Sequence, residues 1–184
     1  MAVEFFVEQA DRSPQSGLAN EEIYAGELVN DAGSGVDLLA FGDSGENAAL
    51  ARYDGQSFAR NFDDEVREPK YDPNDDQRNR VQYQRFESGA LFRVRTIDDD
   101  SATAPSISHR SVVGIVDEGT GDAPSSPEGR VVEEGYTNGT TTYERGNGNF
   151  KAIGVAYRPA RQTGGVMDEY DYPIRVEMFD GLEA

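Results

Sequence analysis

The sequence of 184 residues lacks cysteine and tryptophan altogether and contains a single histidine, His109. The absence of cysteine excludes disulfides, a thiolate nucleophile, iron–sulfur clusters and cysteine-based zinc sites. One histidine leaves little room for a histidine-rich metal centre or a conventional catalytic triad. We expect His109 to be a polar residue at a turn or strand edge. No catalytic motif stands out elsewhere, so we expect a protein that is not an enzyme and needs no cofactor.

Positive charge is also scarce. Acidic residues outnumber basic residues 35 to 17, which gives a formal charge of −18 at pH 7. The only lysines are Lys70 and Lys151, and every other base apart from the histidine is arginine. Nucleic acids and anionic membranes are bound mainly through lysine and arginine. We therefore expect neither a nucleic acid nor a membrane as a partner.

The acidic residues are spread along the whole chain rather than gathered in one tail. Scattered acid with scarce lysine resembles the proteins of extreme halophiles. At molar salt the Debye length falls to about 3 Å, so neighbouring carboxylates scarcely repel one another while they keep the surface hydrated. Salt also strengthens the burial of apolar groups. An acidic domain from an organism of ordinary salinity is the alternative interpretation.

The chain shows no pattern of targeting or membrane insertion. Its first eight residues contain no basic stretch and are interrupted by Glu4 and Glu8, unlike a secretory signal peptide. No apolar run approaches the length of about 20 residues that crosses a bilayer. We expect synthesis in the cytoplasm, and the length fits a single β domain over residues 1–184.

Short runs of β-type residues recur between turn residues. Apolar and charged residues alternate in Phe92–Thr96, and Ile174, Val176 and Met178 share one face of another run. Alternation with one polar face predicts antiparallel sheet. We therefore predict an all-β fold, an antiparallel β-barrel or sandwich of about ten strands. The expected strands are Val3–Glu8, Glu22–Val29, Val36–Phe41, Ala48–Tyr53, Val81–Glu87, Leu91–Ile97, Ser111–Val116, Arg130–Tyr136, Thr140–Arg145, Phe150–Tyr157 and Ile174–Phe179.

Turn residues support this interpretation. Asn138-Gly139 predicts a hairpin, because this pair readily adopts the positive φ angles of a type I′ turn. Asn138 also begins an N-glycosylation pattern, which a hairpin tip would make accessible. The best helix candidate, Glu46–Arg52, is short and overlaps the expected strand Ala48–Tyr53.

Two polar stretches do not fit a compact barrel. Residues 10–20 predict an N-terminal arm or loop, and residues 56–80 predict a long charged loop or projection. A structureless connection of about 25 residues is usually functional or disordered. Mixed charge suits pairing with another chain, and tyrosine with arginine is common at interfaces; a mobile surface loop is the alternative. We expect both stretches to be contact elements, and the candidate partner-binding residues are Arg60, Arg67, Lys70, Tyr71, Arg78 and Arg80.

One part of this charged stretch resembles the start of a calcium loop. Asp72, Asn74 and Asp76 place oxygen ligands at every second position. The pattern then fails, because Gln77 stands where the loop needs glycine and Tyr83 where a bidentate glutamate should close the coordination shell. A structural cation held by Asp72, Asn74 and Asp76 is one hypothesis, and a solvated acidic turn is the other.

Three short motifs carry a family resemblance. They are AGELV at Ala25–Val29, VVGIVD at Val112–Asp117 and AIGVAYRP at Ala152–Pro159. With the halophilic composition, the chain resembles the small β-rich head decoration proteins of tailed viruses, specifically of a haloarchaeal tailed virus with an HK97-type capsid. The resemblance implies a virion structural protein that binds the outer capsid surface and braces the shell against the pressure of packaged DNA.

The resemblance also implies partners and a location. The partners would be the major capsid protein and further copies of the chain itself, in oligomers that are often trimers, and the location would be the capsid surface of the virion. Two alternatives stay open. One is the single-barrel shell protein of a membrane-containing halovirus, which would build a lattice rather than bind one already made. The other is a β-barrel carbohydrate- or ligand-binding domain.

Overall fold

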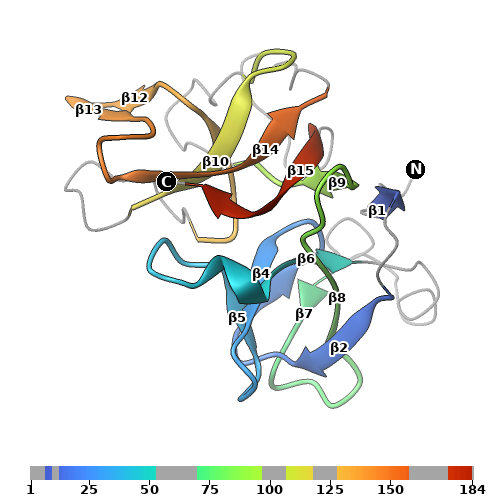
Figure 1. The fold of residues 1–184 in the computed structure, drawn as a ribbon. Coiled ribbons are helices and arrows are strands. Elements are labelled where there is room, and N and C mark those ends of the chain that lie inside the picture. The colour runs from blue at the N-terminus through green and yellow to red at the C-terminus, as the bar shows by residue number, and fades with distance from the viewer. Residues whose placement is uncertain are drawn as a thin grey trace, which may run out of the picture.

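The computed structural model describes residues 7–9, 13–52, 70–96, 107–117, 128–157 and 174–183. Within these ranges the chain forms fifteen strands and one short 3-10 helix, η1 (Gly45–Asn47). The predicted all-β fold is confirmed. Two antiparallel sheets form two lobes that pack against each other (Figure 1). No helix among the described residues is long and apolar enough to cross a membrane.

One lobe is a five-stranded sheet in the order β2-β8-β6-β4-β5. Its strands are β2 (Gln15–Leu18), β4 (Leu28–Asp31), β5 (Val36–Leu38), β6 (Ala48–Arg52) and β8 (Arg80–Arg85). The sheet rolls up until its two edges touch, because Ala19 and Val36 form a parallel bridge and the Asn20 amide donates to the Val36 carbonyl at 3.0 Å. A separate two-stranded ladder joins β3 (Ile23–Tyr24) to β7 (Lys70–Tyr71).

The other lobe is a six-stranded sheet in the order β1-β9-β15-β14-β10-β11. Its strands are β1 (Val7–Gln9), β9 (Leu91–Val94), β10 (Val112–Val116), β11 (Val132–Glu133), β14 (Phe150–Ala156) and β15 (Ile174–Glu183). A parallel bridge between Thr96 and Val131 brings the end of β9 to the start of β11. This sheet is therefore also rolled, and β1 extends it on the far side of β9.

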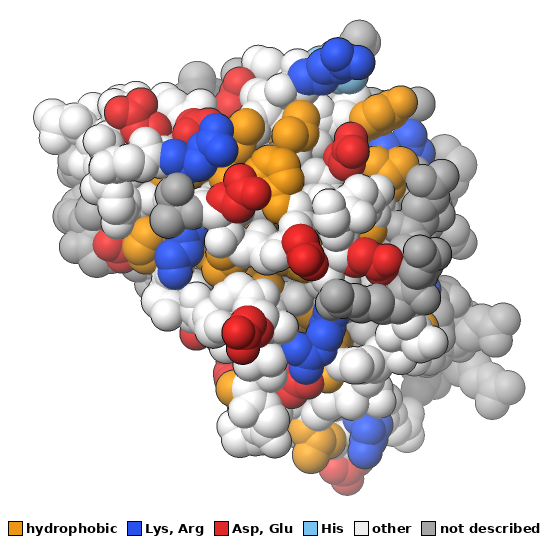
Figure 2. Space-filling model, viewed as in Figure 1, with side chains coloured by type: hydrophobic (Ala, Val, Ile, Leu, Met, Phe, Trp, Pro, Cys, Tyr) orange, Lys and Arg blue, Asp and Glu red, His pale blue; other side chains and the backbone are white. Residues whose placement is uncertain are grey.

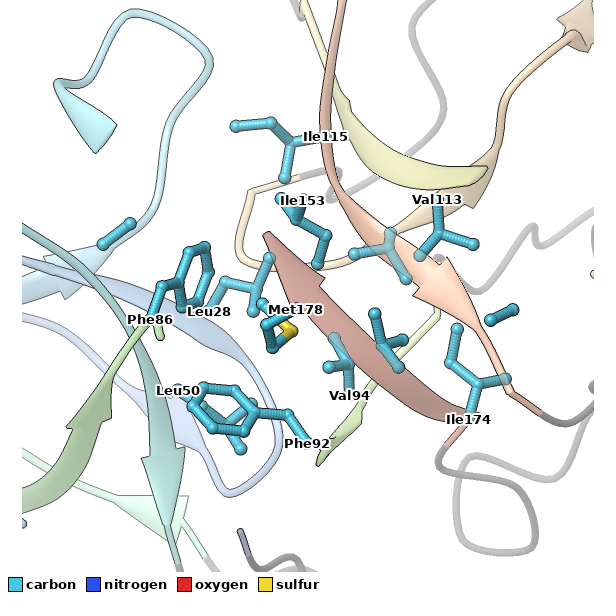
Figure 3. Close-up of a cluster of buried hydrophobic side chains, with 14 of the residues drawn as sticks. Leu28, Leu50, Phe86, Phe92, Val94, Val113, Ile115, Ile153, Ile174 and Met178 are labelled. Carbon is cyan, nitrogen blue, oxygen red and sulfur yellow. The ribbon is translucent and has the colours of Figure 1, made fainter. Parts of the chain in front are cut away.

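Three clusters of buried apolar side chains hold these layers together. In the central cluster, Leu28 and Leu50 of one sheet meet Phe92 and Met178 of the other (Figure 3). A second cluster lies on the opposite face of the five-stranded sheet and includes Tyr71. The third lies between the six-stranded sheet and the hairpin of β12 (Tyr136–Asn138) and β13 (Thr141–Tyr143). Each large side chain buried in this way contributes about 1.5–3 kcal/mol.

Two strands of the five-stranded sheet, β4 and β6, have buried side chains on both faces. In β4, Leu28 points into the central cluster and Val29 into the second, and in β6 Leu50 and Ala49 divide in the same way. Because successive side chains of a strand point to opposite faces, a strand buried on both faces needs an unbroken apolar run. The sequence Ala-Ala-Leu-Ala at the start of β6 is such a run, which is why a short helix over Glu46–Arg52 competed with the expected strand Ala48–Tyr53; the strand is confirmed over Ala48–Arg52. The helix candidate is wrong over Ala48–Arg52, and only the three-residue 3-10 helix η1 precedes the strand.

Two glycines explain why the motifs VVGIV and AIGVA take the form they do. The strand register shifts between Val113 and Gly114 and again between Ala152 and Gly154. A Cβ atom on Gly114 would overlap the Lys151 carbonyl group, and one on Gly154 would overlap the Glu177 carbonyl oxygen. Glycine at these bulges lets the neighbouring backbones approach. Local packing thus accounts for both motifs.

The structure corrects the sequence analysis in the N-terminal half. The stretch predicted as a polar arm contains β2, which runs along β8. The expected strand Glu22–Val29 is broken at the turn Ala25–Gly26, so that its two halves, β3 and β4, join different ladders. The expected loop 56–80 ends in β7, an eight-residue connection over residues 72–79 and the start of β8.

The β12–β13 hairpin forms where it was predicted, but its turn lies one residue later. Asn138 pairs with Thr141, so the two central turn residues are Gly139 and Thr140. Of these, only Gly139 has a positive φ, at 59°. Positive φ at the first central residue alone is the pattern of a type II′ turn, which takes glycine there. The predicted type I′ turn over Asn138-Gly139 is therefore wrong, although the role of glycine is right.

Candidate interaction surface

The two segments predicted to contact a partner lie side by side. β2, from the stretch 10–20, pairs antiparallel with β8, whose first residue, Arg80, ends the long charged stretch. Leu18 lies opposite Arg80 in this ladder. The Nη1 atom of Arg80 is 3.5 Å from the Oγ atom of Ser16, a residue 64 positions earlier in the sequence. Segments far apart in the chain thus form one edge of the five-stranded sheet.

β2 gives this edge the properties of a binding surface. Within the described residues no further strand pairs with its outer side, and the bridge that closes the sheet begins only at Ala19. The Leu18 side chain is 53% exposed, and only Tyr157 is comparable among the large hydrophobic residues described. An edge strand can receive a strand from another chain through its backbone N–H and C=O groups. An exposed leucine beside it offers an apolar anchor.

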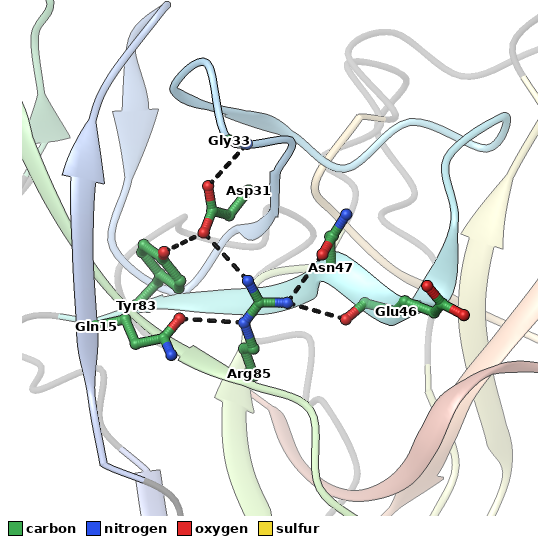
Figure 4. A network of polar contacts seen from close by, with 7 residues as sticks. All are labelled: Gln15, Asp31, Gly33, Glu46, Asn47, Tyr83 and Arg85. Carbon is green, nitrogen blue, oxygen red and sulfur yellow. Dashed lines mark hydrogen bonds and ion pairs between the residues drawn. The ribbon is translucent and has the colours of Figure 1, made fainter.

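A polar network on the neighbouring strands fixes this edge in place (Figure 4). The Arg85 guanidinium donates to Gln15 of β2 at 3.1 Å, to Asp31 of β4 at 3.2 Å and to Asn47 of η1 at 2.9 Å. The Tyr83 hydroxyl also donates to Asp31. Burial raises the pKa of Tyr83 to about 12, and the hydrogen bond to Asp31 acts in the same direction. The phenol therefore stays protonated and keeps its place in the network.

The turn between β7 and β8 is built by aspartate side chains that bond to nearby backbone groups. Asp72 Oδ1 accepts a hydrogen bond from the Asn74 amide at 2.8 Å, and Asp75 Oδ1 accepts one from the Gln77 amide at 2.9 Å. These are Asx turns, the reason aspartate is frequent in turns. Asp75 also binds the Arg78 Nε atom at 2.8 Å. The hydrogen bond from the Gln77 amide and then the one from Arg78 lower the pKa of Asp75. The Asp75 carboxylate therefore stays ionised and keeps both of these contacts.

The same hydrogen bonds bear on the structural cation expected at Asp72, Asn74 and Asp76. One oxygen of Asp72 already serves the backbone of the turn. Within the described ranges, no three histidine, cysteine, aspartate or glutamate residues are placed so that they could hold a metal ion. Hydrogen bonds within the turn therefore stabilise its conformation. The structural cation stays a prediction.

The six candidate partner-binding residues occupy different environments. Arg60 and Arg67 lie outside the described residues, and Lys70 is described only as a backbone member of β7. Arg78 is held by Asp75, and Arg80 is exposed. Tyr71 is the exception: it is 3% exposed, belongs to the second buried cluster, and donates its hydroxyl to the Arg52 carbonyl. The structure places the Tyr71 side chain in the core rather than at a contact surface.

A buried ion pair lies where the two sheets meet, and the sequence analysis did not identify it. Glu27 is 3% exposed, and its Oε1 atom lies 3.0 Å from the Nε atom of Arg130. The other carboxylate oxygen of Glu27, Oε2, accepts a hydrogen bond from the Tyr24 amide at 2.8 Å. Nearby, the buried Arg95 donates from Nε to the Ala25 carbonyl at 2.8 Å and lies over the Tyr24 ring. Burial raises the pKa of Glu27, and Arg130 opposes this effect.

His109 lies in an exposed turn before β10, as predicted. Its Nδ1 atom donates to the Tyr157 carbonyl at 2.5 Å. Asn138 lies at the end of β12 next to the hairpin turn, and glycosylation at this residue stays a prediction.

Comparisons with protein-family models, with curated proteins and with solved structures found no match for the chain. The function must therefore be argued from the composition, the sequence motifs and the surfaces described above.

Proposed function

We propose that this chain is a virion structural protein that binds the outer surface of a viral capsid as a decoration protein and stabilises the shell. The observation that carries the proposal is the edge formed by β2 and the start of β8. There an exposed apolar residue, Leu18, lies opposite an exposed arginine, Arg80, along an edge strand. The major capsid protein is the proposed partner of this surface.

The chemistry of this edge suits a contact that must persist at high salt. At molar salt the Debye length is about 3 Å, so attraction between exposed charges is largely screened. Charge alone would therefore bind a partner weakly. Backbone hydrogen bonds from strand addition and the burial of Leu18 do not depend on this long-range attraction. An arginine that is desolvated against a capsid carboxylate also keeps its hydrogen bonds.

The rest of the surface supports adaptation to salt. In Figure 2 the acidic side chains are scattered over the visible face rather than gathered in one place. Dispersed carboxylates keep such a surface hydrated and prevent non-specific association. A specific contact on this protein then depends on the few places where apolar and basic side chains are exposed together.

A binding assay with capsids from which the protein has been removed tests the proposal. The wild-type chain should rebind these capsids to saturation and raise the temperature at which they release DNA. We expect Leu18→Ser and Arg80→Ser each to weaken rebinding by about tenfold. Arg145→Ser is the control: it removes an exposed arginine from the turn after β13, where Arg145 pairs with Glu134 at 2.8 Å, and should rebind like wild type. Deletion of residues 56–80 is a poor variant, because it would remove β7 and the first residue of β8.

Two results would overturn the proposal. One is a wild-type chain that fails to rebind capsids. The other is rebinding by the Leu18 and Arg80 variants that equals that of the control. A chain that assembles a closed lattice on its own would identify it as a shell protein.

A further inference from the structure

The hydrogen bonds of β2 show which of its backbone groups are left for another strand. In an antiparallel ladder, residues that bond to the partner strand alternate with residues whose N–H and C=O groups point away from it. The Ala19 amide donates to the Asn79 carbonyl, just before β8, at 2.8 Å. Counting back along the ladder, the backbone groups of Leu18 and Ser16 therefore point to the outer side of β2.

The outward-pointing series is short and has two defined ends. At one end the Asn20 amide is already used, because it donates to the Val36 carbonyl at the start of β5 at 3.0 Å. At the other end Pro14 has no amide N–H to donate. Between them lie the amides of Ser16 and Leu18 and the Ser16 carbonyl. No strand among the described residues pairs with this side, and in Figure 1 β2 diverges from β5 toward its N-terminal end.

The side chains beside these backbone groups lie on the outer face of the sheet. Gly17 faces the interior, because a Cβ atom there would lie 2.6 Å from Cγ2 of the buried Val36. Successive side chains of a strand point to opposite faces, so Ser16 and Leu18 face outward. Arg80 lies opposite Leu18 in the ladder and shares this face. A strand added to β2 would place its own side chains beside these three.

The Arg80 guanidinium extends across β2 toward the open edge. Its Nη1 atom lies 3.5 Å from Ser16 Oγ, although its direct neighbour in the ladder is Leu18. No ion pair in the described part of the chain includes Arg80. A carboxylate on an added strand beside Ser16 would therefore lie within reach of this guanidinium, which can bind it through two parallel hydrogen bonds.

We infer that the β2 edge binds an extended acidic segment of its partner as an antiparallel strand. An apolar residue of this segment lies opposite Leu18, which is 53% exposed, and an aspartate or glutamate two residues later lies opposite Ser16, beside Arg80. The direction is antiparallel because only then do the N–H and C=O groups of Ser16 both bond to one opposite residue.

This pattern rests on the proposed function, because it describes the segment that the same edge would bind in the capsid protein. It adds the direction, the register and the charge of that segment. The net charge of −18 on the chain does not prevent the contact, since at molar salt the Debye length is about 3 Å and long-range repulsion is screened.

A peptide-binding assay with the full wild-type chain at molar salt tests the inference. Fluorescence anisotropy should show saturable binding of labelled Thr-Val-Thr-Glu-Thr, and the reversed sequence Thr-Glu-Thr-Val-Thr should bind at least about tenfold more weakly. Methylation of the glutamate amide nitrogen, which faces β2 in this register, should abolish binding. Methylation of the preceding threonine amide nitrogen, which faces away, should change the dissociation constant by less than about threefold.

A matched pair of variants tests the same backbone group on the protein. Ser16→Pro removes the outward amide N–H and breaks no hydrogen bond to β8, and proline is tolerated at such edge positions. We expect it to weaken peptide binding at least about tenfold, whereas Ser16→Ala, which keeps the amide, should bind within about twofold of wild type. Arg80→Ser should weaken binding of the glutamate peptide but not of its glutamine counterpart. Circular dichroism establishes that each variant is folded.

Several results would overturn the inference. They are a wild-type chain that does not bind the peptide, equal binding of the two methylated peptides, equal or tighter binding of the reversed sequence, and equal binding by Ser16→Pro and Ser16→Ala. Because these tests use no capsids, the two failures are distinguishable. A chain that rebinds capsids but fails here contacts them in another way, and a chain that binds the peptide but not capsids binds an acidic segment of a different protein.

Discussion

The buried pair Glu27–Arg130 allows a quantitative prediction. Replacing Arg130 by alanine leaves the Glu27 carboxylate, 3% exposed, without the partner that lies 3.0 Å away. Breaking a buried ion pair from one side costs about 3–5 kcal/mol. Arg95 still attracts the carboxylate and the Tyr24 amide still donates to it, so we expect a loss near the lower end, about 3 kcal/mol. That is a large part of the total stability of a domain, about 5–15 kcal/mol.

The pH dependence identifies the cause of this loss. Burial already raises the pKa of Glu27 above its ordinary 4.5, and Arg130 is the strongest opposing influence, so Arg130→Ala raises the pKa further. The folded variant then binds a proton that the unfolded chain releases, and its stability falls as pH rises between those two pKa values. The loss relative to wild type should therefore be largest near neutral pH and shrink as the pH falls toward 4.5.

Denaturant unfolding at constant molar salt, followed by circular dichroism at several pH values, measures both effects. Glu27→Gln in the Arg130→Ala background removes the unpaired charge and should restore most of the lost stability near pH 7. The reasoning would be refuted if the loss were independent of pH and the second substitution restored nothing. In that case the loss would come from the packing of the Arg130 side chain and not from the stranded carboxylate.

Two further predictions concern packing and solvent. Gly154→Ala should destabilise the fold by about 1–3 kcal/mol, because its Cβ atom would overlap the Glu177 carbonyl oxygen. Gly42→Ala is the control, because Gly42 lies in a turn with open space around it and has no positive φ. Thermal unfolding of both variants separates the clash from the general effect of alanine at a glycine site, and equal losses would contradict the clash. Dialysis from molar to millimolar salt should unfold the chain cooperatively, because the net charge of −18 is then no longer screened. A far-ultraviolet circular dichroism spectrum that keeps its strand signal at low salt would contradict the halophilic interpretation.

The pattern of alternation was enough to predict the fold class and most strands. Ile174, Val176 and Met178 all point into the central cluster, as their spacing indicated. Alternation works here because the six-stranded sheet has one buried and one polar face along β9 and β15. It fails for β2, whose residues are mostly exposed, because the pairing with β8 and not the burial of its own side chains makes this segment a strand.

Features that depend on distant parts of the chain could not be predicted. Glu27 and Arg130 are 103 residues apart, and neither residue type at its position suggests a buried pair. The hairpin turn at Gly139 was displaced by one residue because the pairing of β12 with β13 fixes its register. Tyr71 was taken for a surface residue because its neighbours in the sequence are charged, whereas the β3–β7 ladder turns its side chain into the core.

The candidate surface was predicted in part. Residues 10–20 and 56–80 were both selected as contact elements, but nothing in the sequence showed that they would adjoin. Leu18, the most exposed large hydrophobic residue described, was missed, although an isolated leucine in a polar stretch was a usable signal.

Electron microscopy of native particles tests the central claim most directly. The account predicts two-lobed density outside a separate capsid shell, with the edge strand β2 and Arg80 against the shell surface. Density that forms the continuous shell itself, or particles that contain no such protein, would contradict the claim.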